Sequence, residues 1–155
     1  MTGVLPPLLA EALELARGRI ALDVELKEDG YVPKLAALLS DFAAGGGDLI
    51  VTSFLDRVLV QLTELAPHLG RGLILSVSTR RARKRANACA ATVVLPKMWL
   101  VNEALLAELA GAGVSVIVWD FMAAQHAPLL SDPRIDGVIT DDVPGALAAR
   151  SSRLK

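Results

Sequence analysis

Short strand-like runs recur along the chain at intervals of about 20 to 30 residues, each followed by a segment with helical periodicity. The predicted strands cover residues 20–27, 49–54, 72–77, 91–95, 114–119 and 137–140. The predicted helices cover residues 33–44, 56–66, 79–88, 102–110, 122–130 and 144–150, after a leading helix over 7–17. This alternation predicts an α/β fold of right-handed βα units around a parallel sheet, because parallel neighbours need a crossover connection.

We expect residues 1–155 to form a single domain, with the leading helix in 1–18 and six βα units in 20–150. Two architectures fit this pattern: an open doubly wound sheet, or a partial, shortened TIM-like barrel of about six strands. Asp56, Thr79 and Asn102 each follow a predicted strand and are expected to be N-caps of the next helix. Either architecture would gather the loops after the strands at one ligand-binding end.

The first predicted strand places alternating residues on two different faces. Leu22, Val24 and Leu26 make one face apolar, whereas Glu25 and Lys27 share the opposite face at the carboxyl end of the strand. A carboxylate there could ligate a hard divalent cation, and the adjacent ammonium could neutralise a phosphate. A strand with one wet face explains the same pattern without a ligand, so this motif alone leaves both readings open.

Other polar groups at the predicted strand ends are also candidates for a site. Asp120 follows a strand, and Trp119 could line a pocket there or serve as an ordinary core residue. A basic run over residues 80–85 opens a helix and could hold an anion, although a solvated helix face is the simpler explanation. The two histidines, His68 and His126, are not placed to act as acid or base at these ends.

Five segments resemble, in order and spacing, strands of the glycerophosphodiester phosphodiesterase family. These segments are LDVELK (22–27), VTSF (51–54), RGLI (71–74), VIVW (116–119) and DGVITD (136–141). The resemblance implies a βα barrel that cleaves glycerophosphodiesters, in lipid metabolism, with a divalent metal such as Mg²⁺ or Ca²⁺. It favours the barrel over the open sheet.

The resemblance also implies roles for individual residues. Glu25 matches the family's metal-binding glutamate, Lys27 its phosphate-facing lysine, and Trp119 the tryptophan that lines the glycerol pocket. Ser53 ends a matching strand, and Asp120 follows Trp119 where the family has a threonine; these two complete the expected substrate-binding residues. The expected ligand is a small phosphodiester or phosphate anion.

The chain departs from the family pattern at several points. It lacks the His-Arg-Gly strand, the Glu-x-Asp element with its histidines, and the asparagine expected where residues 93–96 read VVLP. We therefore expect a truncated or degenerate member with weak or no activity, and we name no catalytic residue. The alternative is a non-catalytic module that binds anions or oligomerises.

The remaining expectations concern partners and location. A net charge of −1, with no aromatic platform beside the basic run, predicts no nucleic-acid partner. No apolar stretch reaches the length of a membrane span, and the single cysteine, Cys89, is typical of a buried residue in a reducing, cytoplasmic location.

A barrel of only six strands would have two unpaired edges, at strands 20–27 and 137–140, and an uncovered lumen. Either the six strands close tightly, or two chains cover each other's gap as a homodimer, and we favour the homodimer.

Overall fold

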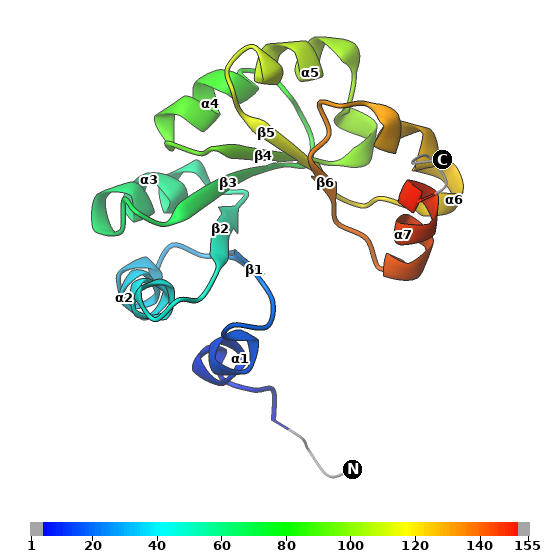
Figure 1. Cartoon of the computed structure of the whole chain (residues 1–155). Coiled ribbons are helices and arrows are strands. Elements are labelled where there is room, and N and C mark those ends of the chain that lie inside the picture. The colour runs from blue at the N-terminus through cyan, green and yellow to red at the C-terminus, as the bar shows by residue number, and fades with distance from the viewer. Residues whose placement is uncertain (1–4, 152–155) are drawn as a thin grey trace.

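The computed structural model describes residues 5–151 of the chain. Six strands form one sheet in chain order, and each pairs in parallel with the next: β1 (Leu22–Glu25), β2 (Leu49–Ser53), β3 (Gly70–Leu75), β4 (Val93–Pro96), β5 (Ser115–Val118) and β6 (Gly137–Val138). The sheet curls into an open arc, with the helices along its convex outer side (Figure 1). This arrangement confirms the predicted partial TIM-like barrel and not the open doubly wound sheet, in which helices cover both faces.

Helices alternate with the strands as the sequence predicts, although several boundaries differ. They are α1 (Leu9–Ala16), α2 (Val32–Ala44), α3 (Asp56–Leu65), α4 (Ala82–Ala88), α5 (Glu103–Ala110), α6 (Ala123–His126) and α7 (Val143–Ser151), with short 3₁₀ helices η1 (Met98–Leu100) and η2 (Ala127–Ser131). No helix in the described part of the chain is long and apolar enough to cross a membrane.

The core lies between the sheet and its outer helices. Around β1 and β2, Val51 packs with Leu39, Phe42, Val58 and Leu62 of the adjacent helices, all of them buried. A second cluster joins β3, β4 and β5 to α4 and α5, and it includes Leu73, Val94, Val116 and Leu109. Strand residues on this face are apolar because the helices exclude water from it.

The other face of the sheet lines the concave side of the arc. A Cβ atom built on Gly72 would lie 2.6 Å from Leu95 and 2.9 Å from Thr52, so these three residues share that face. Asp23 is also on this side, since its carboxylate accepts a hydrogen bond from the Thr52 hydroxyl at 2.7 Å. The predicted alternation of β1 is therefore correct: Leu22 and Val24 are half-buried, whereas Asp23 and Glu25 are exposed.

Three boundary predictions were wrong for identifiable reasons. The strand predicted over 20–27 is β1, four residues long, and Ile20 before it is 66% exposed. The helix predicted over 122–130 is divided into α6 and η2, because Pro128 cannot donate the amide hydrogen bond that an α-helix needs. Helix α4 begins at Ala82 rather than near Thr79, because Arg81 has a left-handed backbone with φ of 60°.

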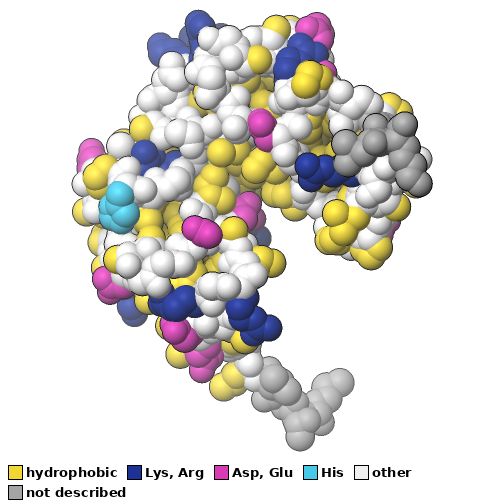
Figure 2. All heavy atoms as spheres, viewed as in Figure 1, with side chains coloured by type: hydrophobic (Ala, Val, Ile, Leu, Met, Phe, Trp, Pro, Cys, Tyr) yellow, Lys and Arg dark blue, Asp and Glu magenta, His cyan; other side chains and the backbone are white. Residues whose placement is uncertain are grey.

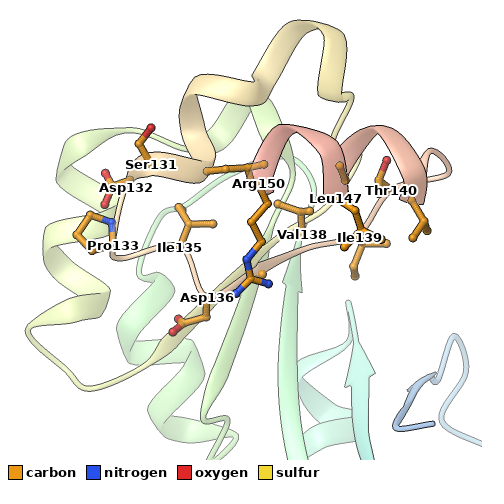
Figure 3. A pocket seen from close by; sticks show the side chains of 14 residues that line it. Ser131, Asp132, Pro133, Ile135, Asp136, Val138, Ile139, Thr140, Leu147 and Arg150 are labelled. Carbon is orange, nitrogen blue, oxygen red and sulfur yellow. The ribbon is translucent and has the colours of Figure 1, made fainter. Parts of the chain in front are cut away.

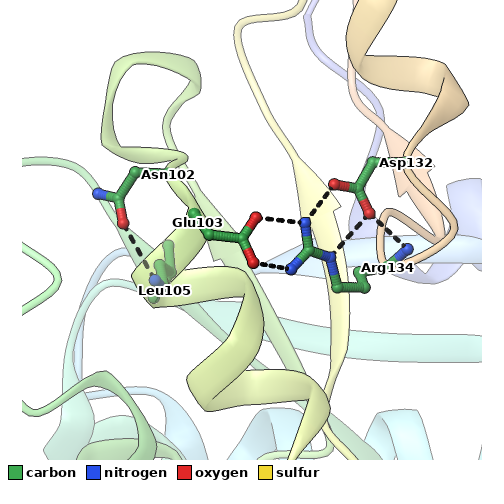
Figure 4. Close-up of polar contacts among 5 residues, drawn as sticks. All are labelled: Asn102, Glu103, Leu105, Asp132 and Arg134. Atoms are coloured by element: carbon green, nitrogen blue, oxygen red, sulfur yellow. Dashed lines mark hydrogen bonds and ion pairs between the residues drawn. The ribbon is translucent and has the colours of Figure 1, made fainter.

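Of the three expected N-caps, only Asn102 caps its helix directly. Its side-chain oxygen accepts a hydrogen bond from the Leu105 amide at 3.0 Å (Figure 4). The next residue, Glu103, joins Asp132 in binding Arg134, with oxygen–nitrogen distances of 2.6 Å to each carboxylate. Hydrogen bonds from Arg134 lower the pKa of Asp132 to about 2 and also lower the pKa of Glu103. This network ties the start of α5 to the segment that precedes β6.

The two outer strands of the arc remain unpaired on one side. Within residues 5–151, β1 pairs only with β2, and β6 pairs only with β5. The six strands therefore do not close tightly on themselves, which was one of the two outcomes that the sequence left open. The homodimer remains a prediction.

Candidate functional site

All the predicted site residues lie at or just beyond the carboxyl ends of the strands. Because the sheet is parallel throughout, these ends lie along one rim of the arc. Glu25 ends β1, Ser53 ends β2, and Trp119 and Asp120 follow β5. Lys27 lies two residues past β1, although the Leu26 amide still donates to the Thr52 carbonyl at 2.8 Å and extends the pairing.

Glu25 and Lys27 line a shallow cavity at the open edge of β1. The cavity has a volume of about 540 Å³ and is also lined by Tyr31 and Leu35 of the following helix region. Both charged side chains are exposed, and neither forms a hydrogen bond or ion pair with another residue of the described range. The side chains of Glu25 and Lys27 are therefore available to bind a ligand.

Asp23 lies two residues before Glu25 in β1, so both side chains are on the same face of the strand. Its carboxylate is held by the Thr52 hydroxyl, and burial raises its pKa more than that hydrogen bond lowers it. Asp23 is thus a partly desolvated carboxylate that adjoins the candidate site, and the sequence analysis did not single it out.

Ser53 has a mainly structural environment. The residue is fully buried, and its hydroxyl donates to the Leu26 carbonyl at 2.6 Å and accepts from the Leu55 amide at 3.1 Å. These bonds hold the end of β2 against the end of β1. Its predicted role in substrate binding remains a prediction.

Trp119 is the centre of an aromatic group at the ends of β2, β4 and β5. Its ring nitrogen donates to the Leu75 carbonyl at 3.2 Å, which fixes the indole over the rim. The Phe54 ring meets it edge to face, with 5.8 Å between ring centroids. The Lys97 ammonium lies 4.8 Å from the Trp119 ring centroid and 4.0 Å from that of Trp99.

Asp120 completes this group. Its carboxylate forms an ion pair with the Lys97 ammonium at 3.2 Å. The backbone of Asp120 is left-handed, with φ of 65°, a conformation that non-glycine residues seldom adopt. A cavity of about 530 Å³ begins at Trp119 and Asp120 and continues along Met122, Ile139, Thr140 and Asp141. The structure thus brings Trp119 and Asp120 together in one cavity, while Glu25 and Lys27 line another.

Lys97 and Phe54 were missed as site residues by the sequence analysis. The predicted strand 91–95 stopped before Pro96, yet β4 includes Pro96, and Lys97 forms a parallel bridge with Trp119. A lysine directly after a strand, next to the segment where the family has its asparagine, was the available signal. Phe54 was noted only as part of the VTSF segment.

The two histidines lie outside the two cavities that contain the predicted site residues. The His126 Nδ1 accepts a hydrogen bond from the Met122 amide at 3.1 Å, and its ring packs beside Phe121. His68 lies between α3 and β3, at the opposite end of the strands.

The residues present do not fit a complete divalent-metal site. Across residues 5–151, no three histidine, cysteine, aspartate or glutamate side chains gather closely enough to hold an ion. Glu25 remains exposed and lacks the further carboxylates that hard cations require. No catalytic step through a metal follows from this arrangement.

A larger cavity, of about 630 Å³, lies beside β6 under η2 and α7. Figure 3 shows Arg150 extending from α7 into it, near Asp136, with Ile135, Val138 and Leu147 along its walls. None of the predicted site residues lines this cavity.

Comparison with known families decides the affiliation. A model of the glycerophosphoryl diester phosphodiesterase family matches residues 19–144, which is more than half of the chain. The chain belongs to this family. No curated protein matches the chain significantly.

Several solved structures with the same fold are described as phosphodiesterases. A phosphodiesterase from Oleispira antarctica, solved with the product sn-glycerol-3-phosphate, has a TM-score of 0.79 and 19% identity over 92% of this chain and 60% of its own. A glycerophosphodiester phosphodiesterase from Parabacteroides distasonis has a TM-score of 0.76 and 16% identity over 95% and 65%. One from Agrobacterium tumefaciens has a TM-score of 0.70 and 22% identity over 92% and 61%. The chain therefore spans less than two thirds of the length of these proteins.

Proposed function

We propose that this chain binds a small phosphodiester or phosphate monoester of glycerol at the carboxyl rim of its half-barrel. The observation that carries the proposal is the free pair Glu25 and Lys27 at the end of β1, within a family whose Oleispira antarctica member was solved with sn-glycerol-3-phosphate. The ammonium of Lys27 has no internal counter-ion within the described residues, so it is available to pair with a phosphate.

Trp119 and Asp120 line a second cavity along the same rim, which we propose as a separate contact site for glycerol. The indole is fixed by its bond to the Leu75 carbonyl and offers an apolar face for the carbon skeleton of glycerol. The 57% exposed carboxylate of Asp120 could accept hydrogen bonds from glycerol hydroxyls. Ser53 is proposed to support ligand binding indirectly, because its hydroxyl bonds to the Leu26 carbonyl and holds the ends of β1 and β2 together.

We further propose that hydrolysis by this chain alone is weak or absent. Cleavage of a phosphodiester needs a group that protonates the departing alkoxide, within hydrogen-bond reach of it. Of the two histidines, His68 lies at the opposite end of the strands, and His126 lines neither cavity that contains the predicted site residues. The described residues also contain no cluster that fits a metal ion. The rim therefore has groups that can bind a ligand but few that can catalyse its hydrolysis.

The experiment is a paired measurement of binding and turnover. Binding of sn-glycerol-3-phosphate is followed by calorimetry, and hydrolysis of a glycerophosphodiester is assayed with added Mg²⁺, Ca²⁺ or Mn²⁺. Lys27→Gln should weaken binding about tenfold, as expected for loss of one charge-assisted contact. Arg19→Gln, which removes an exposed charge at the amino end of β1, is the matched control and should bind like the wild type.

Glu25→Gln distinguishes the two functions left open by the sequence. Turnover that disappears in this variant would establish a working hydrolytic site around Glu25. Binding without turnover in any metal would favour the alternative, a non-catalytic anion-binding or oligomerising module. Equal binding by Lys27→Gln and the wild type would overturn the proposed site.

A further inference from the structure

The residues that flank the two open strands carry charges of opposite sign. Arg19 precedes β1 and Lys27 follows it, and both side chains are exposed. Asp136 precedes β6 and Asp141 follows it, and both are exposed as well. Neither Lys27 nor Asp141 forms a side-chain hydrogen bond or ion pair with another residue of the described range. Each edge therefore presents charge that the other edge could neutralise.

A two-fold axis can join these edges in two ways. An axis along the strands pairs β1 of each chain in parallel with β6 of the other, whereas an axis across the strands pairs each edge in antiparallel with its own copy. In the second arrangement Arg19 of one chain would face the partner's Lys27, and like charges placed opposite each other destabilise a strand pair. The carboxylates of Asp136 and Asp141 would likewise face each other. The first arrangement brings Lys27 to Asp141 and continues the parallel order of the sheet.

Both edges also leave apolar surface for a neighbouring strand. The cavity of about 630 Å³ lies along β6, and Figure 3 shows Val138 and Leu147 on its walls. Leu147 is 58% exposed, and Ile20 beside β1 is 66% exposed. Hydrophobic side chains are visible in the hollow between the two ends of the arc (Figure 2). A strand docked on β6 would bury this surface and pair the free backbone groups of the edge.

Pairing of β1 with β6 would also unite the two cavities that contain the predicted site residues. One cavity lies at the carboxyl end of β1 and contains Lys27. The other extends from Trp119, after β5, to Asp141, after β6. Because neighbouring parallel strands end at the same rim, the partner's Lys27 would lie beside Asp141, at the mouth of the second cavity. Its ammonium has three donors, so it can bind Asp141 and a phosphate oxygen together.

We propose that two copies of this chain share their ligand site, with β1 of each copy paired in parallel with β6 of the other. The partner's Lys27 supplies the positive charge for a phosphate, and Trp119 and Asp120 supply the surface for the glycerol group of the same ligand. The identity of the ligand rests on the proposed function. The strand pairing rests only on the charges and the apolar surface of the two edges, so the two parts are tested separately.

Charge reversal tests the strand pairing without a ligand. Lys27→Glu would place a carboxylate against Asp141, and Asp141→Lys would place an ammonium against Lys27. We expect each single change to raise the dissociation constant of the dimer about tenfold, measured by sedimentation velocity. The variant with both changes restores opposite charges and should dimerise more tightly than either single variant. Lys84→Glu, at an exposed position on α4, is the matched control and should leave the dimer unchanged.

A mixed dimer tests the shared ligand site. Lys27→Gln and Trp119→Ala chains are co-expressed with different affinity tags, and the dimer with one chain of each is isolated by both tags. If the site is shared, one site of this dimer is intact and the other lacks both groups. Calorimetry with sn-glycerol-3-phosphate should then give the wild-type Kd with half the wild-type number of sites. Asp120→Asn serves as a second variant in place of Trp119→Ala, because asparagine tolerates the left-handed backbone at this position.

The outcomes are distinct. A monomeric wild type, or a double reversal that dimerises no better than the single reversals, overturns the strand pairing. Binding by the wild type that the mixed dimers do not recover overturns the shared site and leaves the proposed function standing. Absence of binding by the wild type refutes the proposed function and the shared site together, whereas restored dimerisation of the double reversal would still support the strand pairing.

Discussion

The Phe54 ring meets the Trp119 ring edge to face across the concave mouth of the sheet, with their centroids 5.8 Å apart. Phe54 follows β2 and Trp119 follows β5, so two strands, β3 and β4, lie between the elements that carry them. A contact between residues so far apart in the sheet is possible only because the sheet curls. The pair therefore couples the curvature of the half-barrel to its candidate site.

A double-mutant cycle on Phe54→Ala and Trp119→Ala tests this coupling. Edge-to-face aromatic pairs contribute about 0.5–1.5 kcal/mol beyond the area they bury. The loss of stability in the double variant should therefore be smaller than the sum of the two single losses by about 1 kcal/mol. Urea denaturation of the wild type, both single variants and the double variant provides the four free energies of unfolding. Strict additivity would mean that the rings do not support each other.

Gly72 is expected to be intolerant of a side chain, whereas Gly70 is not. A Cβ on Gly72 would lie 2.6 Å from a Leu95 methyl and 2.9 Å from that of Thr52, so Gly72→Ala overpacks the concave face and should cost about 1–3 kcal/mol. Gly70 is on the same strand, and the nearest atom to its Cβ position would be 3.7 Å away. Gly70→Ala is therefore the matched control and should change the free energy of unfolding little. Comparable losses in both variants would contradict the packing argument.

The repeating pattern of strands and helices predicted the fold because each βα unit is determined by residues that are close together in the chain. Apolar runs, glycines between units and helical periodicity all lie within about 30 residues, and the right-handed crossover rule then leaves few topologies. What the pattern did not predict were element ends. Pro128 divides the helix predicted over 122–130, and the left-handed Arg81 delays α4, since both effects depend on single backbone conformations.

The site was predictable where it follows strand register and unpredictable where it depends on tertiary contacts. Glu25 lies on the concave face as alternation along β1 required. Ser53, by contrast, is committed to the Leu26 carbonyl, a contact made by a residue 27 positions away in the chain. Lys97 was missed because its role depends on two tryptophans from separate units, which no periodicity reveals.

The ion pair between Asp56 and Arg85 should make stability depend on pH in the acid range. Arg85 reaches from α4 to the first residue of α3, with nitrogen–oxygen distances of 2.6 to 3.2 Å. Hydrogen bonding to Arg85, opposed by burial, lowers the pKa of Asp56 below its ordinary value of 3.8. A carboxyl with a lowered pKa in the folded state stabilises the protein above pH 3.8, and this stabilisation is lost as pH falls below that value.

Asp56→Asn measures this contribution. The side chains of Arg85 and Asp56 are 31% and 42% exposed, so solvent screening keeps the expected loss at neutral pH to about 1 kcal/mol. The difference in unfolding free energy between wild type and variant should shrink toward zero as pH falls from about 5 to about 2, a range that spans the ordinary pKa of an aspartate. A difference that stays constant over this range would show that the charge of Asp56 is not the cause.

Cys89 should be chemically inert in the folded protein. The residue is fully buried, as the sequence predicted, and burial together with the nearby Asp56 raises its pKa to about 11. Its thiolate fraction at pH 8 is thus about 100-fold below that of an exposed cysteine. Reaction with a colorimetric disulfide reagent should be at least that much slower in buffer than in concentrated urea. Rapid labelling of native protein would mean that the core around α4 opens readily.

The open edges of the sheet predict a homodimer. Within residues 5–151, strands β1 and β6 each leave one row of backbone donors and acceptors unpaired, and Ile20 beside β1 is 66% exposed. Such edges favour association, and a two-fold axis lets each chain cover the other's edge. Light scattering at micromolar concentration should therefore report the mass of two chains. Ile20→Lys places a charge at the edge and should shift the equilibrium toward one chain, whereas Leu65→Lys, at a 49% exposed position on α3, should not. A strictly monomeric wild type would refute the dimer and leave the edges covered by something other than a second copy.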